Sequence, residues 1–211
     1  MIDCNHQKLS VQFYQNPDVC EVAKCLLGKI LVSNLEGIRT SGVIVETEAY
    51  SYTEKACHAY MNRNTNRTKV LFSAAGTAYV YLCYGIHKLL NVVTNAEGIA
   101  EAVLIRAVQP LDGIQIMTER RNQKKADYNL TSGPGKVCQA LGIGMEHNTT
   151  SLLGNDLWIE SSGTSNEEIV ASPRIGVAYA KEDALLPWRF SFAQNRWVSK
   201  GNNSYQNVVR S

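Results

Sequence analysis

Residues 43–50 read VIVETEAY, a stretch with the apolar content of a buried strand that nevertheless contains two glutamates. Charged carboxylates are almost never fully buried unless they are paired. Because alternate residues of a strand share a face, one side of this strand should carry Ile44, Glu46, Glu48 and Tyr50, and the other Val43, Val45, Thr47 and Ala49. The second face suits a core. The first face is either a solvent-facing surface or the wall of a cleft, where a carboxylate beside an aromatic ring would be a general base.

The pattern on either side of this strand is that of an α+β protein. A helix is expected after Asn16, which reads as its N-cap, with Pro17 at the first helical position and Gly28 at its end. Strands are expected over 29–35, 42–50, 78–85, 89–94, 100–107, 156–160 and 174–178, and helices over 110–121 and after Ser132. Because most strands follow one another through short turns, we predict a mostly antiparallel, curved sheet with flanking helices.

The composition favours one intracellular domain. With 211 residues and 45% hydrophobic content, the chain can bury one sizeable core, and no Pro/Gly/Ser-rich linker divides it. We expect a single domain over 1–211, with its core at about 10–200 and a polar tail over 201–211. No apolar run approaches the roughly 20 residues of a membrane helix, and the first residues lack the features of a secretory signal.

Cysteine spacing gives no sign of a metal or a disulfide framework. The 6 cysteines include no C-x-x-C pair, which excludes zinc-ribbon and thioredoxin patterns. The doublet Cys57-His58 has no spaced partners to complete a metal site. We therefore expect reduced thiols in an intracellular protein and no bound metal.

Positive charge is clustered although the net charge is only +2. One cluster consists of Arg63, Arg67 and Lys69, and a second lies over 120–125. Such clusters are either solvated loop charge or phosphate contacts. The segment SGPGK at 132–136 fails the spacing of a nucleotide-triphosphate loop, but a helix N-terminus with Lys136 nearby can hold a single DNA phosphate.

Two further features have both a structural and a functional interpretation. In AYVYLCYG, residues 78–85, Tyr79 and Tyr81 share a strand face and Tyr84 precedes Gly85 at a predicted turn. Tyr84 is then either a packed strand residue or an exposed contact wedge, since loop tips lie on the surface. Arg106 stands alone in the apolar run VLIRA, where a buried guanidinium needs a carboxylate partner such as Glu46 or Glu48.

Several separate motifs together resemble the alkyladenine (3-methyladenine) DNA glycosylase family. They are FYQNPDVCEVAKCLLGKILV at 13–32, ETEAY at 46–50, AYVYLCYG at 78–85, Asn91, VLIRA at 103–107, SGPGKVCQALGI at 132–143, PRIGV at 173–177 and WVS at 197–199. The likeness runs in order from about residue 10 to 200 without large gaps. It implies a monofunctional base-excision enzyme that flips a damaged purine out of duplex DNA and hydrolyses its N-glycosidic bond.

The resemblance implies a role for individual residues. Glu48 corresponds to the general base, Arg106 to the arginine that holds this carboxylate and the water, and Ile175 to the position whose backbone carbonyl also binds the water. The base-binding positions correspond to Tyr50 and His58 on one face of the flipped base, Tyr81 on the other, and Asn91 against the 2-amino group of guanine. Tyr84 corresponds to the wedge, and Arg63, Arg67 and Lys69 fall in the phosphate-binding loop. His87 stands where some relatives have tyrosine.

The resemblance also implies the partners and the limits of the reaction. The substrate is double-stranded DNA containing damaged purines, the protein is a monomer, and neither a cofactor nor a metal is needed because a carboxylate activates the water. No lysine nucleophile is implied, so strand cleavage is not expected. The compartment would be the cytoplasm or nucleoid of a bacterium, or a eukaryotic nucleus.

Two other function classes can be weighed against this one. A nucleic-acid-binding module without catalysis would use the same basic loop and tyrosines, and only Glu48 with Arg106 separates the two hypotheses. A small-molecule acyl or formyl transferase would need a nucleotide loop or an activated nucleophile, and the sequence offers no pattern for either.

Overall fold

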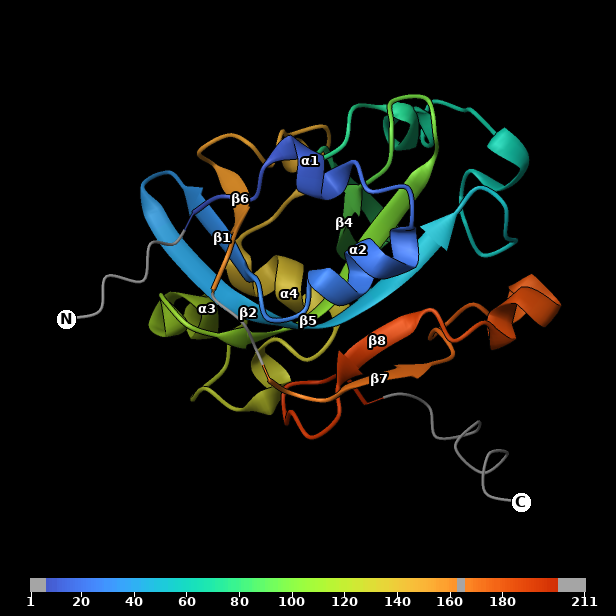
Figure 1. Cartoon of the computed structure of the whole chain (residues 1–211). Coiled ribbons are helices and arrows are strands. Elements are labelled where there is room, and N and C mark those ends of the chain that lie inside the picture. Colours follow the sequence, from blue (N-terminus) through green and yellow to red (C-terminus); the bar gives the residue numbers. More distant parts are fainter. Residues whose placement is uncertain (1–6, 163–165, 201–211) are drawn as a thin grey trace, which may run out of the picture.

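The computed structural model describes residues 7–162 and 166–200, in which one strongly curved, open sheet is packed with short helices (Figure 1). The strand order is β3-β4-β5-β2-β1-β6, with β8 also pairing with β2 and β7 with β8. The strands are β1 (Ile30–Leu35), β2 (Ile38–Ser51), β3 (Ala78–Cys83), β4 (His87–Val93), β5 (Glu101–Pro110), β6 (Leu157–Glu160), β7 (Ile169–Ser172) and β8 (Arg189–Phe192). All these pairings are antiparallel, which confirms the predicted α+β class.

Helices lie on both sides of the curved sheet, and two of them fill its inner side (Figure 1). The α-helices are α1 (Val11–Tyr14), α2 (Val19–Cys25), α3 (Ile114–Arg120) and α4 (Pro134–Leu141). The 3-10 helices are η1 (Tyr60–Asn62), η2 (Lys69–Phe72), η3 (Tyr128–Leu130), η4 (Met145–His147) and η5 (Ala178–Leu185). Figure 1 shows α2 and α4 lying within the curve, and their buried side chains join the main core.

The alternation of strand residues separates this core from a pocket on the other face of the sheet. In β3, β4 and β5, the main core takes Ala78, Val80, Leu90, Val92, Val103 and Ile105. The residues between them face the opposite way and line a cavity, among them Tyr79, Tyr81, Leu89, Asn91, Ala102 and Leu104. The period of two along a strand therefore uses the same three strands for packing and for a site.

An irregularity in β2 changes this alternation beside the two glutamates. The register between β2 and β5 shifts between Ile44 and Glu46 and again between Glu46 and Thr47. As a result Ile44 and Val45 both pack into the main core, whereas the sequence pattern placed Ile44 on the glutamate face. At the same point the other edge of β2 changes partner, from β1 up to Val43 to β8 from Glu46 onward.

The hairpin between β3 and β4 ends in a strained turn. Tyr84 and Gly85 have φ of 50° and 74°, and the N–H of Ile86 donates to the carbonyl of Cys83 at 3.1 Å. Two central residues with positive φ are the signature of a type I′ turn, which suits glycine but is unusual for a bulky residue. The turn holds the Tyr84 side chain 85% exposed.

Several sequence-based predictions of element ends are wrong. Asp18, not Asn16, caps α2, because its carboxylate accepts hydrogen bonds from the N–H groups of Cys20 and Glu21 at 2.9 and 3.1 Å. Pro110 ends β5 instead of opening a helix, and α3 begins at Ile114.

Two further predictions fail in the second half of the chain. Gly133, not Ser132, is the cap of α4, since Ser132 instead forms a bridge with Ala107. Residues 174–178 form no strand, because β7 ends before Pro173, which lacks a backbone donor. The predicted tail over 201–211 lies outside the described residues. Among the residues that the structure describes, no helix is long and apolar enough to span a membrane.

Candidate active site

A cavity of about 1130 Å³ opens on the face of the sheet opposite the main core. It is walled by β2, β3, β4 and β5, by the loops over 52–68 and 175–179, and by the start of α4. Of the residues singled out from the sequence, it brings together Glu48, Tyr50, His58, Arg63, Arg67, Tyr81, Tyr84, Asn91, Arg106, Lys136 and Ile175. Lys69 is exposed at the start of η2 and does not line it.

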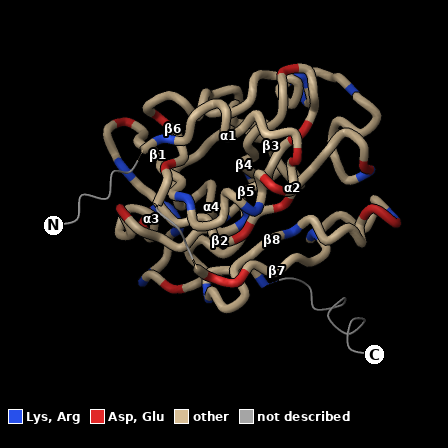
Figure 2. The backbone as a smooth tube through the Cα atoms, viewed as in Figure 1, with Lys and Arg blue, Asp and Glu red and all other residues tan. Residues whose placement is uncertain are grey.

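One buried guanidinium in the cavity wall joins both glutamates. The Nε of Arg106 lies 3.1 Å from Glu46 Oε1, and its NH1 atom lies 3.3 Å from Glu48 Oε1. Both glutamate side chains are fully buried. Burial alone would lower the pKa of Arg106, but the attraction of Glu48 and then Glu46 outweighs it and raises this pKa. In Figure 2, basic (blue) and acidic (red) positions lie close together where β2, β5 and β8 run side by side.

The carboxylate of Glu46 accepts from four donors and does not line the cavity. Besides Arg106, its Oε1 accepts from Arg189 NH1 at 3.3 Å and from the Ser199 hydroxyl at 2.9 Å, and its Oε2 accepts from the Ser199 N–H at 2.7 Å. Three of these four donors meet Oε1 and one meets Oε2, and Glu46 is not among the residues that line the cavity, whereas Glu48 is. Glu46 is therefore a structural counterion that ties β2 to β5, β8 and the segment around Ser199.

The carboxylate of Glu48 keeps one acceptor position open among the described residues. Its Oε1 meets Arg106 and accepts from the N–H of Ile175 at 2.8 Å, and its Oε2 accepts from the Tyr50 hydroxyl at 2.7 Å. Burial and the neighbouring Glu48 charge raise the pKa of Tyr50 well above its usual value, so this phenol stays a donor. A carboxylate offers about four acceptor positions, so Glu48 can accept one further hydrogen bond from the cavity.

Aromatic rings form the wall above this carboxylate. The rings of Tyr79 and Tyr81 are stacked, with centroids 5.4 Å apart and an interplanar angle of 28°, so the two residues share a face as predicted. The His58 ring meets Tyr81 edge-on at 4.6 Å between centroids. Together with Tyr50, these rings offer flat apolar surfaces for a planar ligand.

His58 is held in one neutral form. Arg67 NH2 lies 3.4 Å from Nε2 of His58, and a guanidinium can only donate, so Nε2 is the acceptor and Nδ1 carries the proton. Nδ1 then donates to the Tyr79 hydroxyl oxygen at 3.0 Å. Burial, followed by the Arg67 charge, lowers the pKa of His58 to about 4. Arg67 also lies 5.2 Å from the centroid of Tyr81, which places its guanidinium inside the mouth of the cavity.

The other predicted residues occupy different parts of the cavity. Asn91 is buried, lines the wall, and donates from Nδ2 to the carbonyl of Tyr79 at 3.1 Å. Tyr84 is on the rim at the β3–β4 turn, and Lys136, on α4, contacts Asn129 Oδ1. Ile175 meets Glu48 through its amide N–H; the predicted water contact of its carbonyl stays a prediction.

Sequence reasoning missed Glu54 and Arg174. The two form a buried ion pair with NH2 to Oε2 and NH1 to Oε1 distances of 2.8 Å each. Arg174 was visible within PRIGV, next to Ile175, but a single arginine in a polar loop gave no signal of burial. Among the described residues, no cluster of histidine, cysteine or acidic side chains could hold a metal ion.

Comparison with known proteins gives one consistent result. The family model described as "Methylpurine-DNA glycosylase (MPG)" matches residues 12–196. A curated protein of Chlamydia abortus named "Putative 3-methyladenine DNA glycosylase" is 51% identical over 184 residues, covering 86% of this chain and 96% of the relative. Proteins of the same name from Alkaliphilus oremlandii and Clostridium acetobutylicum are each 46% identical, over 92% and 91% of this chain and 99% and 97% of theirs.

The His58 ring should titrate far below an ordinary histidine. We expect its ¹H–¹⁵N ring signals, assigned with His58→Gln, to keep the Nδ1-protonated neutral pattern at pH 6.5 and to titrate near pH 4. Because the unfolded chain binds this proton from about pH 6.5 downward, the group costs stability as the pH falls from 6.5 to 4, up to about 3 kcal/mol. Urea unfolding at both pH values should show a smaller loss for His58→Gln. A ring midpoint near 6.5 would contradict the buried, neutral assignment.

Proposed function

Because this chain belongs to the methylpurine-DNA glycosylase family, we propose that it hydrolyses the N-glycosidic bond of a damaged purine flipped out of duplex DNA. The substrates proposed are alkylated and deaminated purines, namely 3-methyladenine, 7-methylguanine, hypoxanthine and ethenoadenine. The observation that carries this proposal is the buried Glu48, with one open acceptor position, in the wall of an aromatic-lined cavity. A binding module without catalysis has no need for such a carboxylate.

The cavity suits a flipped base in shape and chemistry. The base would lie between Tyr81 on one face and Tyr50 with His58 on the other, so the rings of His58 and Tyr81, which are in edge-on contact at 4.6 Å here, have to separate when it enters. Base–aromatic stacking contributes ~1–3 kcal/mol per base, comparable to the few kcal/mol that extrusion costs. Damaged or mispaired bases cost less to extrude, which supplies part of the selectivity. Asn91 would crowd the 2-amino group of a guanine in this position.

The proposed reaction is a direct hydrolysis. A water bound to the open acceptor position of Glu48 gives up its proton to this carboxylate as its oxygen bonds to C1′ of the sugar. The C1′–N9 bond breaks at the same time, and its electron pair leaves with the base. A cationic alkylpurine leaves directly, whereas neutral hypoxanthine or ethenoadenine needs protonation. Arg106 and the carbonyl of Ile175 would help to hold the water, and the product is an abasic site.

The rim of the cavity suits contacts with the DNA backbone. Arg63, Arg67, Lys69 and Lys136 are the proposed phosphate ligands, and Tyr84 the wedge that fills the gap left by the flipped nucleotide. We propose that the protein acts as a monomer inside the cell. No lysine is proposed as a nucleophile, so the reaction should stop at the abasic site without strand cleavage.

Glu48→Gln should abolish excision and preserve binding to damaged DNA. The amide keeps the shape of the carboxylate but cannot accept the proton of the water, and general-base contributions are typically ~10²–10⁴-fold. The measurement is single-turnover excision of hypoxanthine from an inosine-containing duplex, with binding followed separately.

Glu46→Gln is the matched control for this prediction. Its carboxylate meets four buried donors but does not line the cavity, so the change should lower the melting temperature while the folded fraction keeps much more of its excision rate. Excision by Glu48→Gln within threefold of wild type would exclude Glu48 as the base. A wild-type protein that binds damaged duplex but excises no damaged purine would favour the binding module.

Asn91→Ser should widen the base range toward guanine. The Asn91 side chain is fixed against the Tyr79 carbonyl, so it cannot easily move away from a 2-amino group. Removing a clash of this size is worth roughly tenfold or more in rate. The measurement is the excision ratio of 7-methylguanine to hypoxanthine in both proteins, after checking that the variant is stably folded. An unchanged ratio would show that Asn91 only supports the strand.

Tyr84→Ala should leave stability nearly unchanged and impair excision from duplex DNA. The ring is 85% exposed on a turn with φ of 50°, so it contributes little to the core while its backbone conformation is unfavourable. We expect weaker binding and slower excision with a duplex, and a smaller effect with single-stranded or bulged DNA. Tyr84→Phe, which keeps the ring, should retain most activity. Equal slowing on both kinds of DNA, or loss of folding, would refute the wedge assignment.

A further inference from the structure

Arg174 joins three separate parts of the chain from a fully buried position. Its NH1 donates to the carbonyl of Ala49 on β2 at 2.9 Å and to Glu54 Oε1 at 2.8 Å. Its NH2 donates to Glu54 Oε2 at 2.8 Å and to the carbonyl of Asp183 on η5 at 3.1 Å. One planar guanidinium thus fixes the end of β2, the loop after it, and the segment around η5 relative to one another.

The same guanidinium lies against two aromatic rings. Its carbon is 4.8 Å from the centroid of Tyr50 and 5.3 Å from that of Trp188. Cation–π contacts of this kind contribute more when the cation is desolvated. The contact with Tyr50 matters most here, because it packs the ring whose hydroxyl donates to Glu48.

Both neutral donors to Glu48 therefore depend on Arg174. Tyr50 is held by its ring, and Ile175, the next residue along the chain, presents its N–H to Glu48 Oε1 at 2.8 Å. The Ala49 carbonyl, between Glu48 and Tyr50 in sequence, accepts from Arg174 as well. We propose that Arg174, anchored by Glu54, is a positioning residue that sets Tyr50 and Ile175 against Glu48, an inference that rests on the proposed function.

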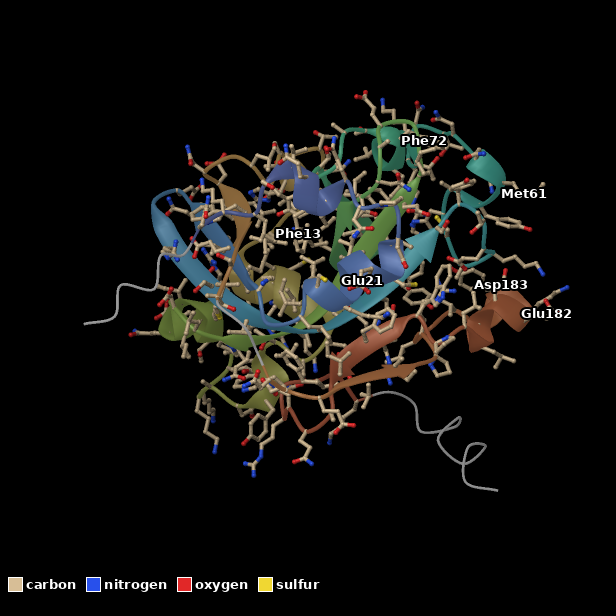
Figure 3. The ribbon with its side chains drawn as sticks, in the orientation of Figure 1. Phe13, Glu21, Met61, Phe72, Glu182 and Asp183 are labelled. Atoms are coloured by element: carbon tan, nitrogen blue, oxygen red, sulfur yellow. The ribbon has the colours of Figure 1, made fainter. Side chains whose placement is uncertain are left out.

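An outer set of contacts joins the same two segments at the surface. Lys55 Nζ lies 3.0 Å from Glu182 Oε2, and the backbone N–H of Lys55 donates to Asp183 Oδ2 at 2.8 Å. The Tyr179 hydroxyl donates to the carbonyl of Ala56 at 3.0 Å. Figure 3 shows Glu182 and Asp183 at the outer tip of their segment. Exposed ion pairs contribute little, so we assign the positioning to the buried Arg174–Glu54 pair and not to Lys55.

Lysine cannot replace Arg174 in this role. An ammonium has three donors on a flexible stem and no planar fork, so it cannot reach both oxygens of Glu54 together with the carbonyls of Ala49 and Asp183. Arg174→Lys keeps the buried charge but should loosen the geometry around Glu48. Glu54→Gln removes the anchor from the other side and should act through the same interaction.

The test measures the geometry and the activity separately. In Arg174→Lys and Glu54→Gln we expect the single-turnover excision rate constant of the active fraction to fall tenfold or more, while affinity for a damaged duplex stays within about threefold. Hydrogen exchange of the Ile175 amide, followed by NMR, should accelerate relative to other amides in both variants. The double variant should be no slower than the slower single one, because both changes break one interaction.

Two controls separate positioning from a loss of stability. Glu182→Gln, which breaks the exposed ion pair with Lys55 from the side that does not line the cavity, should resemble wild type. Leu152→Ala truncates a fully buried core residue away from the cavity, so it should lower the melting temperature and the active fraction without changing the rate constant or the relative exchange of Ile175.

Each outcome bears on one hypothesis. Arg174→Lys behaving like Leu152→Ala would overturn the positioning role. A wild-type protein that excises no purine would refute the proposed function, and the exchange of Ile175 in the variants would still decide whether Arg174 fixes this amide.

Discussion

The ion pairs of Arg106 with Glu46 and Glu48 are the interaction on which the site depends. Two carboxylates buried side by side would repel each other and would cost several kcal/mol each in desolvation without a cation. Arg106 lies between them, and Arg189 adds a second positive charge on the side of Glu46. Position relative to the cavity then differentiates two identical side chains. Glu46 meets four donors and does not line the cavity, whereas Glu48 meets three, lines the cavity and retains one acceptor position.

The fold produces this asymmetry through one irregularity in β2. At the register shift beside Glu46, the strand that pairs with this edge of β2 changes from β1 to β8, and β8 contributes Arg189. Beyond the shift, one face of the sheet packs the main core and the other holds Glu48 and the aromatic wall. Arg174 then fixes the loops over the carboxylate. Helices α2 and α4 pack into the core on the inner side of the sheet. Glu48, Tyr50 and Arg106 are on strands, and Ile175 is in a loop next to Arg174.

Local patterns in the sequence were sufficient for the fold class and for two features of the cavity. Alternation in AYVYLCYG placed Tyr79 and Tyr81 on one face, and the lone Arg106 in an apolar run required a carboxylate partner, which turned out to be both glutamates. The shift that moves Ile44 into the core was not predictable, because a bulge depends on which strands pair and not on the strand itself. Arg174 was missed for a related reason. Three of its four acceptor atoms belong to Ala49 and Glu54, more than 100 residues away in sequence, and only the folded chain brings them to Arg174.

The most direct test of this account is a crystal structure of Glu48→Gln bound to a duplex with one ethenoadenine. We expect the modified base to be flipped and stacked between Tyr81 and the rings of Tyr50 and His58, with Tyr84 in the gap. The side chain at position 48 should be within reach of a water that faces C1′ of the sugar, at about 2.6–3.2 Å. A base that remains in the helix, or one bound where position 48 cannot contact such a water, would contradict the central role of Glu48.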